Sequence, residues 1–212
     1  MVHKGIAVTE VVVTGREAHS SLPHMGVSAV GEAIDLMAVL RSIERKLAES
    51  ADPEALFQPS YPTLSIGQVT GGTATNILAR ECKFVFDLRC PPGHDIDQIL
   101  APFTEAASAA HERLQARYSE AGVEINRLTN VPPLTPTSGS PAETLVRALT
   151  GDNALRAVPY ATEAGQFHQA GIPAVICGPG SIDQAHTPNE FIAISELEKG
   201  VEIFGKLVAN LA

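Results

Sequence analysis

The stretch from Ala174 to Glu190, AVICGPGSIDQAHTPNE, holds the residue whose chemistry is easiest to name. An apolar run over 174–177 predicts a short buried strand, which a Gly-Pro-Gly turn over 178–180 ends. His186 follows in a polar loop at the carboxyl end of that strand, where open α/β sheets tend to bind their ligands. Neutral imidazole is a common metal ligand, so His186 is a candidate ligand, although a lone loop histidine is more often a surface residue.

Polar side chains that could contact a ligand lie in four other segments. One is the loop AHSSLPH, whose residues could also simply satisfy loop backbone groups. A second follows a Gly-Gly turn, and a third ends a strand, where an ion pair with a nearby acid is the simple alternative. The fourth is TEAGQF, in which an acid near a helix start is favourable without any substrate. The polar residues concerned are His19, Asn76, Arg89, Thr162 and Glu163, and Gly165 lies in the fourth segment.

Hydrophobic periodicity predicts the elements that must position these residues. Strands are predicted over 6–14, 63–70, 78–89 and 123–128, and amphipathic helices over 27–47 and 96–116. Asp95 is the expected N-cap of the second helix. The order β-α-β-β-α-β is typical of the ferredoxin-like fold, an antiparallel sheet with two helices on one face.

A proline-rich stretch over 131–141, VPPLTPTSGSP, indicates a domain boundary. We therefore expect one domain over residues 5–131 and a second segment over residues 132–212. In the second segment the pattern predicts a short helix over 142–149, a strand over 156–160 and a terminal helix over 192–211. Ser195 is the expected N-cap of that last helix.

Several motifs together resemble the M20 family of zinc aminoacylases and peptidases, and in particular its acetylornithine deacetylase branch. They are GREAHSSLPHMG, GGTATN followed by FDLR, TEAGQF and AHTPNE. The resemblance implies that residues 5–131 form a lid and dimer-forming domain. It implies that residues 132–212 are the carboxyl-terminal part of the α/β catalytic domain of a zinc hydrolase. The expected fold class is thus α+β followed by α/β.

The resemblance also implies roles for individual residues. His186 would bind one of two bridged metal ions, zinc or cobalt. His19 would reach the active site of the partner subunit and stabilise the oxyanion of the tetrahedral intermediate. Asn76 would hydrogen-bond the substrate from the lid, and Arg89 would hold a substrate carboxylate, which suits the guanidinium fork. The substrate-side set is completed by Thr162, Glu163, Gly165 and Gly178.

Most of the metal site that the family needs is absent from this sequence. The chain has no HxD segment and no Glu-Glu pair, which in the family supply metal ligands and the general base. One histidine does not make a zinc site. We therefore expect the chain to be the carboxyl-terminal portion of such an enzyme, inactive alone and without stoichiometric metal.

Composition argues against two classes of partner. Of the 212 residues, 24 are acidic and 15 basic, which gives a net charge of −9. Nucleic acids and anionic membranes need clustered Lys and Arg, so neither is an expected partner. The sequence shows no signal peptide and no long apolar span, which leads us to expect a cytoplasmic protein.

Two functions of different class stay open. In the first, the chain is part of a metal-dependent amidohydrolase that removes the acyl group from an N-acyl amino acid such as N-acetylornithine. In the second, it is a non-catalytic module that dimerises or binds a partner. Both include a homodimer or higher oligomer, because unpaired strand edges adhere to one another.

Overall fold

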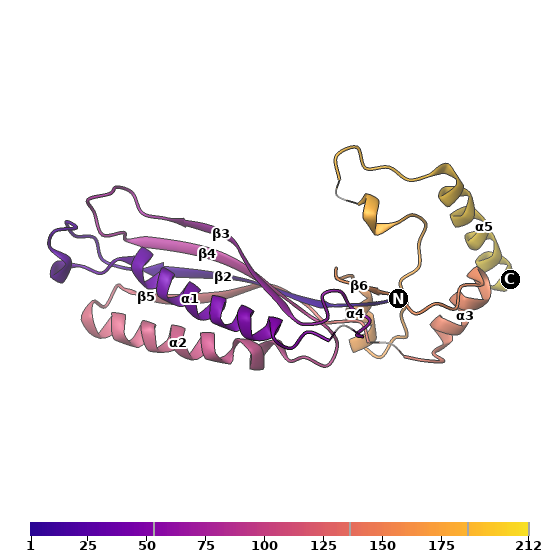
Figure 1. The fold of residues 1–212 in the computed structure, drawn as a ribbon, viewed down its shortest axis with the longest axis horizontal. Helices are drawn as coiled ribbons and strands as arrows, with labels where there is room; N and C mark the ends of the chain where they lie inside the picture. The colour runs from indigo at the N-terminus through magenta and orange to yellow at the C-terminus, as the bar shows by residue number, and fades with distance from the viewer. Residues whose placement is uncertain (53, 136, 186, 212) are drawn as a thin grey trace.

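A four-stranded antiparallel sheet with two long helices on one face forms the larger part of the molecule (Figure 1). This computed structural model describes residues 1–52, 54–135, 137–185 and 187–211. The elements are β2 (Gly5–Thr14), α1 (Ala29–Ala48), β3 (Thr63–Gly71), β4 (Glu81–Cys90), α2 (Ile96–Arg117) and β5 (Gly122–Val131). Their spatial order is β3-β4-β2-β5, so the predicted ferredoxin-like arrangement is confirmed.

The core of this domain follows from alternation along the two central strands. Val11 and Val13 of β2 and Phe84 and Phe86 of β4 are fully buried under the helices. Phe103 of α2 meets Phe86 edge to face, with ring centroids 5.4 Å apart. Each buried side chain of this size contributes about 1.5–3 kcal/mol relative to an exposed one. The helix-covered face of the sheet is therefore the main source of the domain's stability.

Side-chain caps fix where both long helices begin. The Asp95 carboxylate accepts hydrogen bonds from the backbone N–H groups of Asp97 and Gln98, at 2.8 and 3.3 Å. The prediction of Asp95 as an N-cap is therefore confirmed. Ser28 does the same for α1, accepting from the N–H of Gly31 at 3.2 Å. A cap of this kind stabilises a helix by about 1 kcal/mol.

The described residues outside this domain form two short strands and three helices. β1 (Val2–His3) pairs in parallel with β6 (Ala157–Val158). The helices are α3 (Pro141–Thr150), α4 (Ala164–Gln169) and α5 (Ile194–Leu211), with a single turn of 3-10 helix, η2 (Ile182–Gln184). A second such turn, η1 (Pro23–Met25), lies within the domain, in the loop between β2 and α1. Figure 1 shows α3 and α5 at one end of an elongated molecule, beyond the end of the sheet.

Two predictions for this second segment are wrong, and a third is confirmed only in part. The stretch 174–177 forms no strand, and Cys177 is exposed. A strand exists only through hydrogen bonds to a neighbour, and among the described residues no strand pairs with this stretch. The strand predicted over 156–160 is present but covers only Ala157–Val158, which pair with the two residues of β1. Ser195 lies inside α5, which begins at Ile194, so it is not the N-cap.

One face of α5 is apolar and exposed. Val201, Phe204 and Val208 follow each other at helical spacing, and their exposed fractions are 73%, 67% and 67%. Soluble domains bury such a stripe against another element. Within the described part of the chain, α5 therefore leaves its apolar face without cover.

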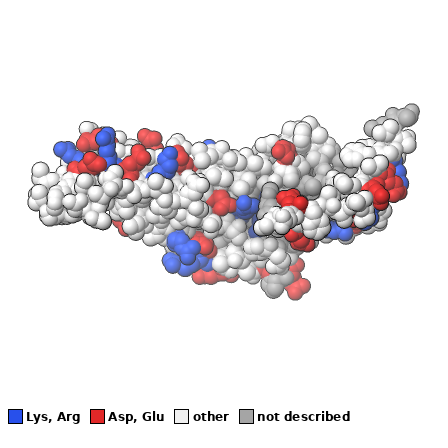
Figure 2. Space-filling model, turned by 90° about the horizontal axis from the view of Figure 1, so that it is seen from above, with Lys and Arg blue, Asp and Glu red and all other residues white. Residues whose placement is uncertain are grey.

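Charged side chains are mixed in sign on the face seen in Figure 2, where Lys and Arg lie among Asp and Glu. Oppositely charged side chains also pair across neighbouring strands, as Lys83 and Glu10 do at 3.0 Å. Among the helices of the described chain, none is long and apolar enough to cross a membrane.

The three thiols should differ sharply in reactivity. Cys82 and Cys90 are buried, and burial raises both pKa values, that of Cys90 to about 11. At about pH 8, roughly one Cys90 thiol in a thousand would be ionised. We expect dithionitrobenzoate to modify Cys177 quickly and the other two only after unfolding. Cys177→Ser should abolish the fast phase, and two or three equal fast phases in the unchanged chain would contradict this burial.

Candidate functional site

His19 and Asn76 come together at one end of the sheet. His19 lies in the loop between β2 and α1, and Asn76 in the loop between β3 and β4. His19 and Ile77 form an antiparallel bridge, and the N–H of Ser20 donates to the carbonyl oxygen of Asn76 at 2.9 Å. Backbone pairing thus places the two candidates side by side, although their segments are far apart in sequence.

The ring of His19 is held in a defined tautomer. The backbone N–H of Ser21 points at His19 Nδ1 over 3.2 Å, and the Ser21 hydroxyl lies 2.7 Å from the same atom. A backbone N–H can only donate, so Nδ1 must accept with its lone pair. The neutral ring then carries its proton on Nε2. Because His19 is exposed, this Nε2–H is available to a group outside the loop.

Arg89 lies toward the other end of the sheet. It pairs with Ile6 and Thr63, and the eight-residue span from Glu81 to Arg89 corresponds to roughly 26 Å of strand. Its Nε donates to a carboxylate oxygen of Asp87 at 2.8 Å. The simple alternative, an ion pair with a nearby acid, is therefore present in the structure. Arg89 and the loop of His19 do not share one small ligand within a single chain.

The TEAGQF segment forms the start of α4, next to the N-terminus of the chain (Figure 1). The Thr162 hydroxyl accepts from the N–H of Ala164 at 3.2 Å, whereas the exposed Glu163 side chain makes no cap hydrogen bond. Gly165 is buried, and a Cβ built on it would lie 2.1 Å from the carbonyl oxygen of Pro132. Close packing against the backbone therefore requires glycine here, whether or not a substrate contacts it.

The sequence did not predict the burial of two polar residues that directly precede β2. His3 and Lys4 are almost completely buried, and burial lowers the pKa of each. Lys4 Nζ donates to the carbonyl oxygen of Tyr61 at 2.8 Å, and His3 accepts at its own carbonyl oxygen from the N–H of Leu134 at 3.2 Å. The segment that leads into β2 and the segment that follows β5 therefore run side by side. A polar pair just before a strand looks like surface, so the sequence carries no signal for its burial.

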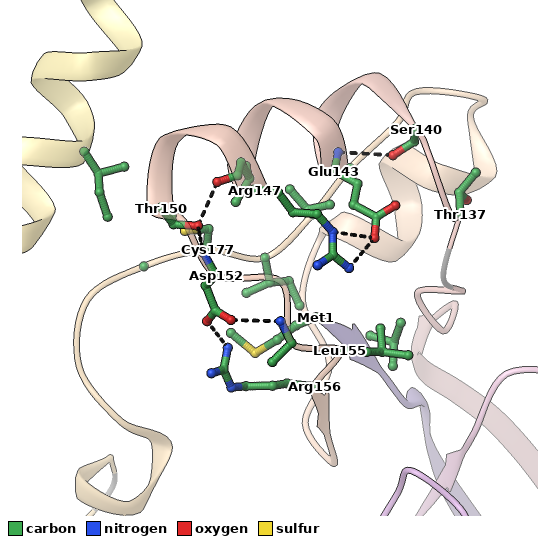
Figure 3. Close-up of a pocket in the computed structure, with 18 of the residues that line it drawn as sticks. Met1, Thr137, Ser140, Glu143, Arg147, Thr150, Asp152, Leu155, Arg156 and Cys177 are labelled. Carbon is green, nitrogen blue, oxygen red and sulfur yellow. Dashed lines mark hydrogen bonds and ion pairs between the residues drawn. The ribbon is translucent and has the colours of Figure 1, made fainter.

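Gly178 lines an open cavity of about 460 Å³ that is separate from the other candidates (Figure 3). The cavity lies between α3, the stretch 174–178, the first two residues and α5. Its acids are already engaged: Arg147 donates to Glu143 at 2.7 Å, and Arg156 to Asp152. The hydrogen bond from Arg147 lowers the pKa of the Glu143 carboxyl. With these charges paired and apolar side chains between them, the cavity suits a packed polypeptide better than a charged ligand.

The metal site implied by the resemblance does not take shape in the described chain. His186 lies outside the described residues. Among the residues that are described, no group of three or more His, Cys, Asp or Glu is arranged to hold a metal ion. The donors among the described residues therefore do not fit a pair of metal ions. The candidates fall instead into separate groups at the sheet end, at the strand end of Arg89, at α4 and at the cavity.

Solved structures share this fold. The aminopeptidase PepT from Bacillus cereus ATCC 10987 superposes with a TM-score of 0.68 and 21% identity, over 96% of this chain and 51% of its own. A tripeptidase from Staphylococcus aureus subsp. aureus Mu50 gives 0.66 and 23%, over 99% and 53%. At such identities the likeness shows the fold alone.

Sequence comparison adds the family. Acetylornithine deacetylase from Aliivibrio salmonicida (strain LFI1238) is 33% identical over 97% of this chain, and its counterpart from Myxococcus xanthus is 29% identical over 98%. The chain spans about half of each relative, 53% in both cases. The peptidase dimerisation domain family matches residues 2–115. The chain therefore belongs to the M20 family of metal-dependent hydrolases and carries its peptidase dimerisation domain.

Proposed function

We propose that this chain is the lid and closing portion of a metal-dependent amidohydrolase that acts on N-acyl amino acids such as N-acetylornithine. The proposal includes the division into residues 5–131 and 132–212, and zinc or cobalt as the metal of the complete enzyme. Relatives named acetylornithine deacetylase, which match nearly the whole chain, support it. The observation that carries the proposal is the geometry of His19. It presents an exposed Nε2–H donor beside Asn76, at the end of the sheet away from β6 and α4.

Amide hydrolysis needs a donor in such a place. Addition of water to the acyl carbon gives a tetrahedral intermediate whose oxygen carries negative charge. Its collapse breaks the C–N bond, regenerates a carbonyl and releases the amine, which takes up a proton that the water supplied. A neutral imidazole can donate a hydrogen bond from Nε2 to that oxygen without transferring its proton. One such donor is worth about 100- to 1000-fold in kcat. His19 is fixed in the tautomer that this role requires.

The dimensions of the sheet favour action on a second copy. The loop of His19 lies at the end of the sheet opposite to β6 and α4 (Figure 1). The strand length between those ends, roughly 30 Å, is too great for one small substrate to bridge. We therefore propose a homodimer in which His19 and Asn76 serve the substrate-side residues of the partner. The free thiols fit a reducing compartment such as the cytoplasm.

A second candidate function is a non-catalytic module that binds another polypeptide. The exposed apolar face of α5 favours it, as do the unpaired stretch 174–177 and the cavity beside it. α5 offers an apolar helix face, and the stretch 174–177 offers backbone groups that are not paired in a sheet. A polypeptide that contributes a strand could cover both. The natural occupant would be a segment equivalent to the half of the relatives that this chain does not match. The two candidates therefore differ in whether the completed assembly turns over substrate.

Oligomerisation can be tested at the two outermost strands. Light scattering should give at least twice the chain mass of 22.3 kDa. Val69 on β3 and Leu128 on β5 are exposed apolar residues on the edge strands. If copies pair through one edge, Val69→Lys or Leu128→Lys on that edge should dissociate them, and the other variant serves as its control. A monodisperse monomer for the unchanged chain would contradict the proposed dimer.

Reconstitution separates the two candidate functions. Elemental analysis of the purified chain should find less than stoichiometric zinc. An activity assay on the same sample should find no deacetylation of N-acetylornithine. Co-expression with the unmatched half of the Aliivibrio salmonicida relative should yield a complex that retains metal and turns over substrate. A stable complex with metal but without turnover would favour the binding module. Stoichiometric zinc with turnover in the chain alone would mean that it holds a complete metal site.

The role of His19 can be tested in that reconstituted complex. His19→Ala should lower kcat about 100- to 1000-fold with little change in KM, because the donor acts only on the transition state. His19→Gln, whose amide N–H reaches the position of Nε2, should retain more activity than His19→Asn, which is shorter. Equal activity of all variants would remove His19 from the mechanism. His24→Ala, on the same loop, serves as the control.

A further inference from the structure

The outer part of the His19 loop is anchored by residues from a distant helix end. Arg117 Nη2 donates to the carbonyl oxygen of His24 at 2.8 Å, and the Tyr118 hydroxyl lies 3.4 Å from the same oxygen. Both residues come from the C-terminal end of α2, more than 90 positions along the chain. A cationic donor makes the stronger kind of hydrogen bond to a backbone carbonyl.

The ring of Tyr118 contacts two guanidinium groups. Arg16, at the start of the loop, has its guanidinium carbon 4.6 Å from the ring centre, and Arg117 lies at 5.3 Å. Both distances fall within the range of cation–π attraction. Arg16 is also 3.6 Å from Glu120. The base of the loop, at Arg16, and its outer turn, residues 22–25, are therefore both tied to the C-terminal end of α2.

The outer turn has few other anchors. Leu22 and Met25 are exposed, with fractions of 48% and 56%, so burial of apolar side chains does not hold the turn in place. Its own hydrogen bonds run from the N–H of Leu22 to the carbonyl of His19 and from the N–H of Met25 to the carbonyl of Leu22, at 2.8 and 3.0 Å. The pairing with the loop of Asn76 holds only the inner side. The end of α2 therefore supplies the restraint on the outer side.

We propose that Arg117 and Tyr118 are positioning residues for His19. They fix the outer turn, and through the turn they fix the Ser21–His19 contact that keeps the Nε2–H facing outward. This proposal rests on the role proposed above for His19. A catalytic donor misplaced by about 1 Å can cost on the order of 100-fold in rate, so even a loose turn would matter.

The first test measures amide hydrogen exchange on the 212-residue chain by NMR. Arg117→Ala and Tyr118→Leu should speed exchange of the Leu22 and Met25 amides about tenfold, while the Leu78 amide, which bonds to Ala18, stays unchanged. Tyr118→Phe, which keeps the aromatic ring that both guanidinium groups contact, should stay within about twofold of the unchanged chain.

Arg113→Ala is the matched control, because Arg113 lies one turn earlier on α2 and pairs with Glu32 instead of the loop. It should leave the Leu22 and Met25 amides unchanged. Unaltered exchange at these amides in both test variants would overturn the proposal. Equal acceleration throughout the sheet would also overturn it, because Arg117 and Tyr118 would then stabilise the domain as a whole.

Activity supplies the second readout and separates this proposal from the proposed function. In the reconstituted complex, Arg117→Ala should lower kcat about tenfold and leave KM nearly unchanged, and the ring nitrogen signals of His19 should show a smaller fraction of the Nε2–H tautomer. Loss of activity through KM alone would overturn the positioning role. If exchange responds as expected but the unchanged complex is inactive, the proposed function fails while the anchoring of the loop stands.

Discussion

The antiparallel pairing of β2 with β4 is the constraint on which the rest of the structure depends. All ten residues of each strand are in register, from Gly5 opposite Cys90 to Thr14 opposite Glu81. Because side chains alternate, this register sends Val11, Phe84 and Phe86 to the helices. If β4 shifted by one residue against β2, Phe84 and Phe86 would turn to the opposite face of the sheet. The register also decides which loops meet at each end of the sheet.

That pairing explains why the candidate residues are separated. At one end, the loops that follow β2 and β3 meet, and their backbone bonds bring His19 to Asn76. At the other end, the connections into and out of the sheet run side by side, and the buried pair His3 and Lys4 lies among them with Gly165 packed close by. A rigid sheet holds these two groups apart. This separation supports the proposal that His19 and Asn76 act on a second copy.

The segment beyond β5 shows the opposite physical situation. Its predicted strand over 174–177 has the apolar composition of a buried strand, yet it stays unpaired in the described chain. The apolar face of α5 is exposed for the same reason, since nothing described in the chain packs against it. Composition sets what a segment would bury, but only a partner allows the burial. The chain spans about half the length of the relatives that it matches.

The sequence by itself determined the elements whose cues are local. Alternation predicted β2 and β4, helical periodicity predicted α1 and α2, and Asp95 marked a helix start, because each cue acts within a few residues. The motifs also pointed to His19 and Asn76, but not to their contact. Only the tertiary structure decided that contact, the tautomer of His19, and its anchoring by Arg117 and Tyr118. It also decided the ion pair of Arg89 with Asp87 and the burial of Lys4. These depend on strand register and on contacts between residues far apart in the chain, which no local pattern encodes.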